Sequence, residues 1–214
     1  MTPPGFHLYP SFLSSRAQAA LVTQVLALAE IAPFYRPVTP WGRPMSVEMT
    51  CFGPLGWVTD AGGYRYAPQH PGTGEPWPPI PEILIDMWSS ITGESDLPDA
   101  CLVNLYREGS RMGLHQDRDE RDFSCPVLSV SLGDTAIFRI GSDSRRGRSV
   151  SLRLASGDVC VLAGASRLAF HGVDRIVAGS STLIPGGGRI NLTLRRAADR
   201  ADSQASTRKT ESTR

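Results

Sequence analysis

The sequence predicts a mainly β domain of the α+β class: a jelly-roll double sheet supported by two helices. Short β-type runs follow one another from Ala100 onward, at residues 101 to 106, 127 to 132, 135 to 140, 149 to 154, 159 to 163, 167 to 173 and 189 to 195. Turn residues such as Gly133-Asp134 separate them, and strands at this spacing are typical of a double sheet with its mouth open to ligands. With 214 residues, 41% of them hydrophobic, the chain can build one large core.

The first helix is expected from Ser15 to about Ala32. Ser15 and Gln18 have the spacing of a capping box, and apolar residues recur at helical spacing at positions 21, 22, 25, 28 and 29. The prolines at positions 33 and 37 end this helix. A second helix is expected from Pro81, a favourable first-turn residue, to Gly93, and its wide apolar stripe should pack on a sheet.

Residues 38 to 80 are rich in Gly and Pro but also contain large aromatic side chains, namely Trp41, Trp57, Tyr64, Tyr66 and Trp77. This combination predicts an ordered loop-and-hairpin cover rather than a flexible linker. The alternative is that the rings fill a small core, since large rings are usually buried.

The domain organisation follows from these segments. We expect an N-terminal segment and helix at 1 to 37, the cover and second helix at 38 to 96, the jelly-roll core at 97 to 197, and a tail at 198 to 214. The first three form one compact domain. The tail has no aromatic and almost no aliphatic residue, so it cannot bury enough surface to offset its ordering entropy, and we expect it to be disordered.

Metal ligands are expected in Leu-His-Gln-Asp, residues 114 to 117. His115 and Asp117 lie two apart, so an extended backbone points both side chains the same way. His171, in Ala-Phe-His-Gly-Val, is the natural third ligand. Two histidines and one carboxylate can occupy one face of an octahedral Fe(II) and leave positions open for a cosubstrate and O₂. His-x-Asp is common by chance, so its weight depends on the downstream strand.

That downstream strand, residues 188 to 195, carries polar groups at every second position. Arg189, Asn191, Thr193 and Arg195 share one parity, so a pleated strand places all four on one face. A row that faces solvent is the simpler explanation. Because the strand follows the three candidate ligands, we favour a cavity that holds a dicarboxylate, which an arginine fork binds through two parallel hydrogen bonds.

These motifs resemble the AlkB-type Fe(II)- and 2-oxoglutarate-dependent dioxygenases, which repair alkylated nucleic acid, and in particular their bacterial branch. The resemblance runs in family order from about residue 38 to 196. Its stretches are Met-Ser-Val-Glu-Met-Thr, Leu-Gly-Trp, Gly-Tyr-Arg-Tyr-Ala-Pro, Cys-Leu-Val-Asn-Leu-Tyr, Leu-His-Gln-Asp-Arg-Asp-Glu, Ser-Val-Ser-Leu-Gly, Ser-Arg-Leu-Ala-Phe-His-Gly and Arg-Ile-Asn-Leu-Thr.

The resemblance implies a double-stranded β-helix fold, a nucleotide-recognition lid, and a role for each site residue. The residues expected to hold Fe(II) are His115, Asp117 and His171. Those expected to contact 2-oxoglutarate are Asn104, Tyr106, Arg189, Asn191 and Arg195. Those expected to contact the nucleotide are Trp57, which stacks on the damaged base, Tyr64 and Tyr66, which line the backbone channel, Asp119 and Arg145.

The implied reaction is oxidative demethylation of 1-methyladenine and 3-methylcytosine, in which O₂ and 2-oxoglutarate yield succinate, CO₂ and formaldehyde. The expected substrate is single-stranded DNA, with double-stranded DNA and RNA left open. A net charge of +1 gives no overall attraction to phosphate, so binding requires a local basic patch. Arginines at positions 107, 111, 118, 121, 145, 146 and 148 flank the site in sequence and are candidates.

Composition limits the other possibilities. No apolar run approaches the roughly 18 to 20 residues that span a bilayer, and the first residues do not read as a signal peptide, so we expect a cytoplasmic protein. We also expect it to be a monomer. The four cysteines form no Cys-x-x-Cys pair and should be reduced, buried thiols. His7 and His70 are expected at the surface, and Glu120, like most carboxylates, in solvent.

Two other functions remain open at this stage. The first is a dioxygenase of the same chemistry that acts on a protein or a small molecule, against which the segment from Trp57 to Tyr66 argues. The second is a cupin-like binding protein without catalysis, which would have no need of Arg189 and Arg195 on one face. The sequence does not decide between DNA and RNA or between single and double strands, nor does it give the range of adducts, the recruiting partners or the phosphate contacts.

Overall fold

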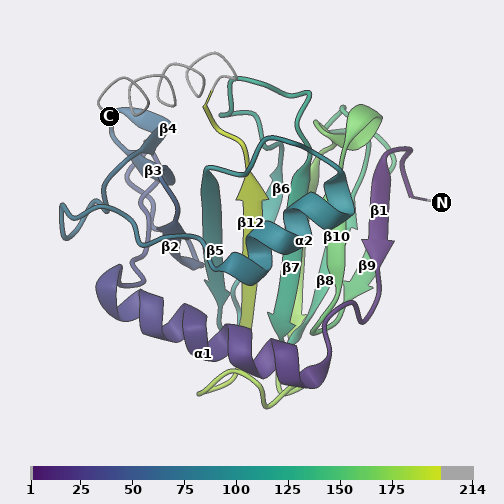
Figure 1. Ribbon diagram of the computed structural model, residues 1–214. Helices are drawn as coiled ribbons and strands as arrows, with labels where there is room; N and C mark the ends of the chain where they lie inside the picture. Colours follow the sequence, from purple (N-terminus) through teal and green to yellow (C-terminus); the bar gives the residue numbers. More distant parts are fainter. Residues whose placement is uncertain (1, 199–214) are drawn as a thin grey trace.

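The computed structural model describes residues 2 to 198 and shows two antiparallel sheets packed face to face (Figure 1). The larger sheet has the strand order β1 (Phe6–Tyr9), β10 (Val159–Leu162), β7 (Val127–Gly133), β12 (Arg189–Arg195), β5 (Ala100–Tyr106), β2 (Glu48–Phe52). The smaller has the order β6 (Met112–His115), β11 (His171–Val177), β8 (Thr135–Ile140), β9 (Val150–Leu154). The jelly-roll prediction is therefore confirmed.

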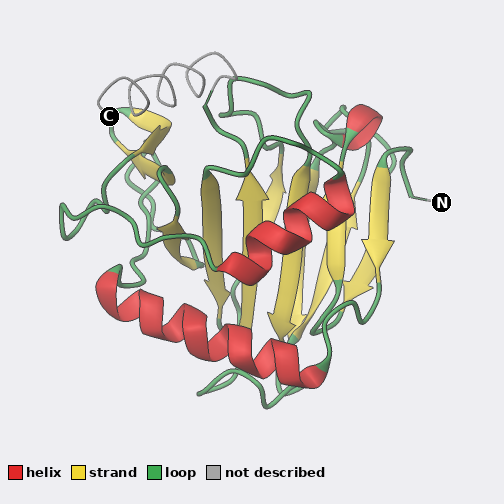
Figure 2. Ribbon diagram, viewed as in Figure 1, coloured by secondary structure: helices red, strands yellow, loops and turns green. Residues whose placement is uncertain are grey.

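Three further elements surround the sheets. The helices α1 (Ser15–Ile31) and α2 (Glu82–Thr92) lie across the outer face of the six-stranded sheet (Figures 1 and 2). The hairpin of β3 (Gly56–Asp60) and β4 (Gly63–Ala67) stands beyond β2 at one edge. It belongs to the cover that the sequence predicted between the helices, although β2, from the same segment, pairs with β5 in the main sheet.

Side chains that alternate along the strands of the larger sheet contribute to two separate hydrophobic cores, one on each face of the sheet. Ile190, Leu192 and Leu194 of β12 pack in the cluster that includes residues of α1 and α2. The opposite parity of β12 faces the smaller sheet, where a second cluster joins residues such as Phe138 and Leu154 to the inner face of the larger one. Because successive side chains of a strand point to opposite faces, polar residues on the inner parity are enclosed between the sheets.

The N-cap of helix α1 lies one residue earlier than the capping pattern predicted. Ser14 is the N-cap, and its Oγ accepts a hydrogen bond from Ala17 N at 3.2 Å. Gln18 has a tertiary role instead: its side chain donates to Leu13 O at 2.8 Å and accepts from Ser156 Oγ at 2.6 Å. The helix is thereby tied to the turn before β10.

Helix α2 packs through its apolar stripe, as predicted, and its Trp88 is fully buried. Pro81 occupies the N-cap position rather than the first turn, and Gly93 closes the helix with a φ of 69°. This left-handed conformation favours glycine at a helix end.

The strand predicted at 167 to 173 is shifted. In the structure β11 begins at His171, and a 3-10 helix at Gly164–Ser166 precedes it. The apolar composition of the stretch was misleading because Arg167 is turned inward, where its guanidinium hydrogen-bonds to backbone carbonyls of another segment. The short strands β1, β2 and β6 were also missed as strands, since four or five residues carry little periodic signal.

Other expectations concern termini and single residues. The tail predicted at 198 to 214 lies outside the described residues except for Ala198, and the domain boundaries remain a proposal. All four cysteines are buried thiols outside any disulfide, and burial raises the pKa of Cys51 and Cys160 to about 12. No described helix is long and apolar enough to cross a membrane.

Candidate active site

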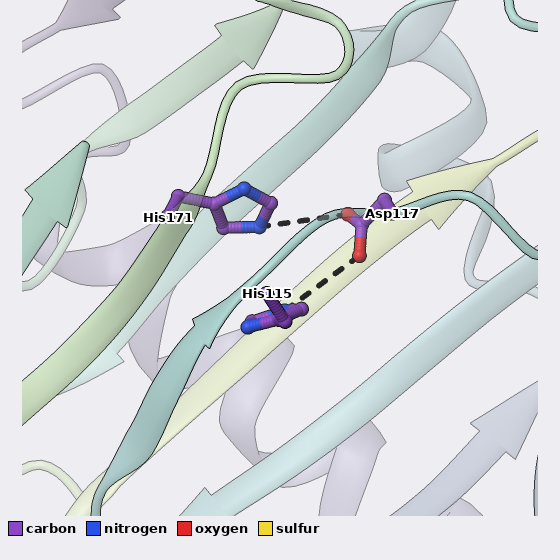
Figure 3. Close-up of side chains that lie close together, drawn as sticks. All are labelled: His115, Asp117 and His171. Atoms are coloured by element: carbon purple, nitrogen blue, oxygen red, sulfur yellow. Dashed lines mark ion pairs between the residues drawn. The ribbon is translucent and has the colours of Figure 1, made fainter. Parts of the chain in front are cut away.

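Three side chains, two from neighbouring strands and one from the loop that follows β6, meet at one point between the sheets. His115 is the last residue of β6, His171 is the first of β11, and the two are paired across the strands. Asp117 follows in the loop after β6. The three ligand atoms all lie within 4.8 Å of one another. Nε2 of His115 lies 3.7 Å from Asp117 Oδ1, and Nε2 of His171 lies 3.7 Å from Asp117 Oδ2. Both rings point toward this carboxylate (Figure 3).

Both imidazoles are oriented as metal ligands require. Nδ1 of His115 lies 2.9 Å from Gly113 O, and Nδ1 of His171 lies 2.9 Å from Ala169 O. A carbonyl only accepts, so each Nδ1 carries the proton and each Nε2 is left with a free lone pair. Burial, with the neighbouring His115, lowers the pKa of His171 to about 4, which keeps it neutral.

Asp117 is held as a carboxylate. Burial opposes its ionisation, but Arg195 and the two histidines outweigh that effect and hold the pKa of Asp117 well below its usual range. Two imidazoles and one carboxylate form the donor set that suits Fe(II) in the 2-His-1-carboxylate arrangement.

The triad opens into a cavity of about 600 Å³. Residues from both sheets and from the β3–β4 hairpin line it. Several buried atoms of its lining have no hydrogen-bond partner among the described residues, namely Asp117 Oδ2, Asn104 Oδ1 and Arg189 Nε. Buried polar groups are nearly always paired in folded proteins, so these atoms indicate ligands. The residues present therefore fit a metal ion and a polar cosubstrate.

Arg189 is a buried cation beside the cavity, with a relative exposure of 1%. Its Nη2 donates to Ser131 Oγ at 2.8 Å and its Nη1 lies 3.4 Å from Leu154 O, so uncharged groups position it. Burial lowers its pKa, yet an arginine stays protonated. A buried guanidinium with an unused Nε is suited to a carboxylate from outside the chain.

The other cosubstrate candidates surround Arg189 as the strand parity predicted. Asn191 of β12 lies opposite Asn104 of β5, and Arg189 lies opposite Tyr106. All four line the cavity. Asn191 Nδ2 donates to Ser129 Oγ at 2.7 Å and to Val130 O at 3.0 Å, which fixes its amide. Burial raises the pKa of Tyr106 to about 12, so its hydroxyl remains a donor.

Arg195 belongs to a buried ionic network. Its Nη2 lies 2.8 Å from Asp117 Oδ1, and its Nε lies 3.4 Å from Glu120 Oε1. Tyr66 donates its hydroxyl hydrogen to Glu120 Oε1 at 2.6 Å. The expectation that Glu120 is solvated was wrong: its relative exposure is 5%, because it lies between two buried guanidiniums.

The second guanidinium is that of Arg167, which sequence reasoning missed. Its Nη2 lies 3.2 Å from Glu120 Oε2, while Nη1 donates to Asp117 O at 2.7 Å and Nε to Cys125 O at 2.8 Å. Arg167 thus fixes the loop that carries Asp117. Its position four residues before His171 was the only signal, and arginines are usually exposed.

The β3–β4 hairpin brings aromatic rings to the cavity mouth. Trp57 and Tyr64 stack with their centroids 5.4 Å apart and an interplanar angle of 16°, and both line the cavity. Trp57 Nε1 donates to Asp119 Oδ2 at 2.7 Å. Arg145 lies over the ring of Phe170, 6.0 Å from its centroid, and also lines the cavity. Tyr66, unlike Trp57 and Tyr64, is not part of the cavity lining, and its hydroxyl points into the ionic network of Glu120 and Arg195.

The remaining histidines lie away from the triad. His7 is exposed, as expected. His70 is buried, contrary to expectation: its Nε2 lies 2.8 Å from Pro33 O, and its ring packs edge-on against Tyr35 and Trp77. Its Nδ1 accepts hydrogen bonds from two backbone amides of the following turn, so its role is structural.

Comparisons with known proteins agree with this geometry. The model of the 2OG-Fe(II) oxygenase superfamily matches residues 5 to 195. An alpha-ketoglutarate-dependent dioxygenase AlkB homolog of Caulobacter vibrioides is 63% identical over 91% of this chain and 88% of that protein. The alpha-ketoglutarate-dependent dioxygenase AlkB of Escherichia coli is 43% identical over 85% of each chain. The solved structure of OsALKBH1 covers 92% of this chain and 98% of its own, with a TM-score of 0.78 and 32% identity.

Proposed function

Because the chain belongs to the AlkB family of the 2OG-Fe(II) oxygenase superfamily, we propose that His115, Asp117 and His171 hold Fe(II) and that the inner face of β12 binds 2-oxoglutarate. The chain is an Fe(II)- and 2-oxoglutarate-dependent dioxygenase that oxidatively demethylates bases of nucleic acid. The observation that carries the assignment of residues is the convergence of three ligand atoms within 4.8 Å at a cavity lined by a buried arginine whose Nε has no partner among the described residues.

The cosubstrate contacts follow from the cavity lining. Arg189 binds the distal carboxylate of 2-oxoglutarate through its guanidinium fork, and the Tyr106 hydroxyl donates a hydrogen bond beside it. Arg195 compensates the charge of Asp117 and lies near the end of the cosubstrate that meets the metal. When bound, Fe(II) supplies the redox chemistry by which O₂ and 2-oxoglutarate oxidise the methyl carbon, which gives succinate, CO₂ and formaldehyde.

The nucleotide contacts lie at the mouth. The damaged base stacks on Trp57, and the hydrogen bond from the indole to Asp119 holds ring and carboxylate in a fixed relation. A flipped base needs such a platform, since it has left its own stack. Asp119 is then placed to attract a cationic ring and to accept a hydrogen bond from its exocyclic amine.

We expect Arg189→Lys to raise the concentration of 2-oxoglutarate needed for half-maximal rate, because lysine keeps the charge but loses the bidentate fork. Affinity for nucleic acid should change little. Succinate formation is titrated against 2-oxoglutarate at saturating substrate, with exposed Arg153→Lys on β9 as the control. An unaltered requirement in Arg189→Lys would show that another group binds the distal carboxylate.

We expect Asp119→Asn to lower kcat/KM for 1-methyladenine and 3-methylcytosine more than for 3-methylthymine. The first two rings are cationic at neutral pH and the third is neutral, so only the first two lose attraction to the carboxylate. The cation-π attraction of Trp57, about 0.5 to 2 kcal/mol, persists in the variant. Equal losses on all three lesions in single-stranded oligonucleotides would leave Asp119 a positioning role alone.

Among nucleic acids, the proposed substrate is single-stranded DNA. The proposed enzyme is a monomer that acts in the cytoplasm. More distant relatives are named as a demethylase of DNA and a demethylase of tRNA, so both polymers are candidates. Lesions in single strands are already unpaired, which removes the cost of extrusion. The deciding experiment offers Fe(II), 2-oxoglutarate and O₂ with matched methylated DNA and RNA oligonucleotides, single- and double-stranded. Mass spectrometry follows the loss of one methylene mass per lesion.

The same assay separates the other candidate functions. A methylated peptide or a free methylated nucleoside that turned over faster than any oligonucleotide would identify a protein or small-molecule hydroxylase. Binding of 2-oxoglutarate with no succinate formed on any substrate would identify a cupin-like binding protein.

A further inference from the structure

Trp41 carries the largest relative exposure among the large apolar side chains of residues 2 to 198, at 79%. The other tryptophans are engaged: Trp57 lines the cavity, and Trp77 and Trp88 are buried. A single apolar residue at the surface is ordinary. The position of Trp41 is different, because the backbone that carries it is fixed.

Trp41 occupies the tip of a tight turn. Gly42 N donates to Thr39 O at 2.8 Å, Thr39 N donates to Arg43 O at 2.9 Å, and Arg43 N donates to Thr39 Oγ1 at 3.1 Å. Gly42 has a φ of 76°, which glycine adopts at little cost, and Pro40 restricts the backbone just before the indole. These constraints fix the backbone that carries the exposed indole.

The turn is anchored beside the cavity mouth. Thr59 of β3 donates its hydroxyl hydrogen to Val38 O at 3.3 Å, which joins the turn to the hairpin that carries Trp57. On the other side, Ser46 Oγ donates to Arg111 O at 2.9 Å, immediately before the strand that ends at His115. Met45, between these anchors, lines the cavity. The turn is therefore continuous with the proposed nucleotide site.

Residues on either side of Trp41 in sequence line a groove, and an exposed arginine follows two residues later. A groove of about 480 Å³ is lined by Pro40 and Gly42, on either side of Trp41 in sequence, and by Thr59 and Asp60 of the hairpin. Asp60 is neutralised by its ion pair with Arg65. Arg43, two residues from Trp41, is exposed. An aromatic face with a neighbouring guanidinium is the combination that binds a nucleotide, through its base and its phosphate.

We propose that Trp41 is a second stacking platform, which binds the base next to the one held in the cavity. This contact rests on the proposed function, since it requires a nucleic-acid substrate. It would act on affinity and leave the chemical step unchanged, because the indole is outside the cavity lining. The competing occupant is a second copy of the chain, docked through the same exposed indole.

The test uses single-stranded oligonucleotides of about nine nucleotides with one central 1-methyladenine, a length within the range of single-strand binding sites. One series also lacks a single base, at each position around the lesion in turn. Wild type, Trp41→Ala, Trp41→Phe and Phe12→Ala are compared as enzymes loaded with Fe(II) and 2-oxoglutarate. Phe12 is another exposed ring, on the segment before α1. Anaerobic binding gives Kd, and aerobic assays give kcat and KM.

Trp41→Ala is expected to weaken binding about fivefold or more, the equivalent of one stacked base, with kcat unchanged. Trp41→Phe should recover most of the affinity, and Phe12→Ala should match wild type. At one position around the lesion, removal of the base should weaken binding to the wild-type enzyme but should not further weaken binding to Trp41→Ala. If wild type demethylates the oligonucleotides and no abasic position distinguishes the two enzymes, the contact is overturned while the function stands. Self-association lost in Trp41→Ala would also overturn it, and no binding by wild type would overturn both.

Discussion

Replacing His115 with alanine is expected to reduce succinate formation about a hundredfold or more while the fold remains intact. Loss of one ligand removes the geometry that three donors impose on Fe(II), and even changes behind the ligands cost 10- to 100-fold, roughly, in metal affinity or activity. The folding cost is small because the His115 side chain is 40% exposed and its backbone partner, Gly113 O, belongs to its own strand.

The measurements are Fe(II) affinity under anaerobic conditions, succinate formation and Tm. His7→Ala is the matched control, since His7 is an exposed histidine on β1. It should match wild type in all three measurements. Wild-type rates of succinate formation by His115→Ala would remove this residue from the metal site.

Asp117→Ala is a less selective variant of the same site. Its carboxylate also lies 2.8 Å from Arg195 Nη2, so its removal leaves a buried guanidinium short of one counter-charge. Lost activity in that variant would combine lost metal binding with lost stability. The His115→Ala variant tests metal binding with little loss of stability. Comparing the Tm of the two variants without metal would then measure how much Asp117 contributes to the stability of the fold.

What the sequence predicted well depends on local geometry. Arg189, Asn191 and Arg195 could be assigned to one face because side chains alternate along any strand, and the structure encloses that face between the sheets. His115 and Asp117 converge for a related reason, as they are only two residues apart. The proposed third ligand, His171, could be chosen because few histidines were available, and strand pairing places it opposite His115.

What the sequence could not predict depends on contacts between distant segments. Glu120 meets Arg167 across 47 residues and Tyr66 across 54 residues, and no spacing rule connects such positions. Average behaviour then gives the wrong answer, since most carboxylates and arginines are exposed. His70 shows the same limit, because its burial depends on a carbonyl 37 residues earlier. Burial of polar residues is decided by tertiary partners.

The largest effect on stability is expected from Glu120→Ala. Glu120 is the carboxylate shared by Arg195 and Arg167, and its side chain is 1% exposed. Its removal leaves Arg167 without that counter-charge and leaves Arg195 with Asp117 alone. Breaking a buried ion pair on one side costs about 3 to 5 kcal/mol, because a buried charge remains uncompensated. For a domain of this size, the corresponding loss in Tm is about 6 to 20 °C.

Thermal unfolding without metal measures this loss, and two variants identify its cause. Glu108→Ala, at an exposed glutamate, should leave Tm within about 2 °C of wild type. Tyr66→Phe keeps every charge but removes the hydrogen bond to Glu120, worth about 1 kcal/mol, together with the longer one that the hydroxyl accepts from Arg195 Nη1 at 3.4 Å. If charge compensation dominates, Glu120→Gln should be nearly as unstable as Glu120→Ala, although it retains the shape and the acceptor for Tyr66. A Tm for Glu120→Gln close to that of Tyr66→Phe would instead show that packing and hydrogen bonding, not the carboxylate charge, hold this network together.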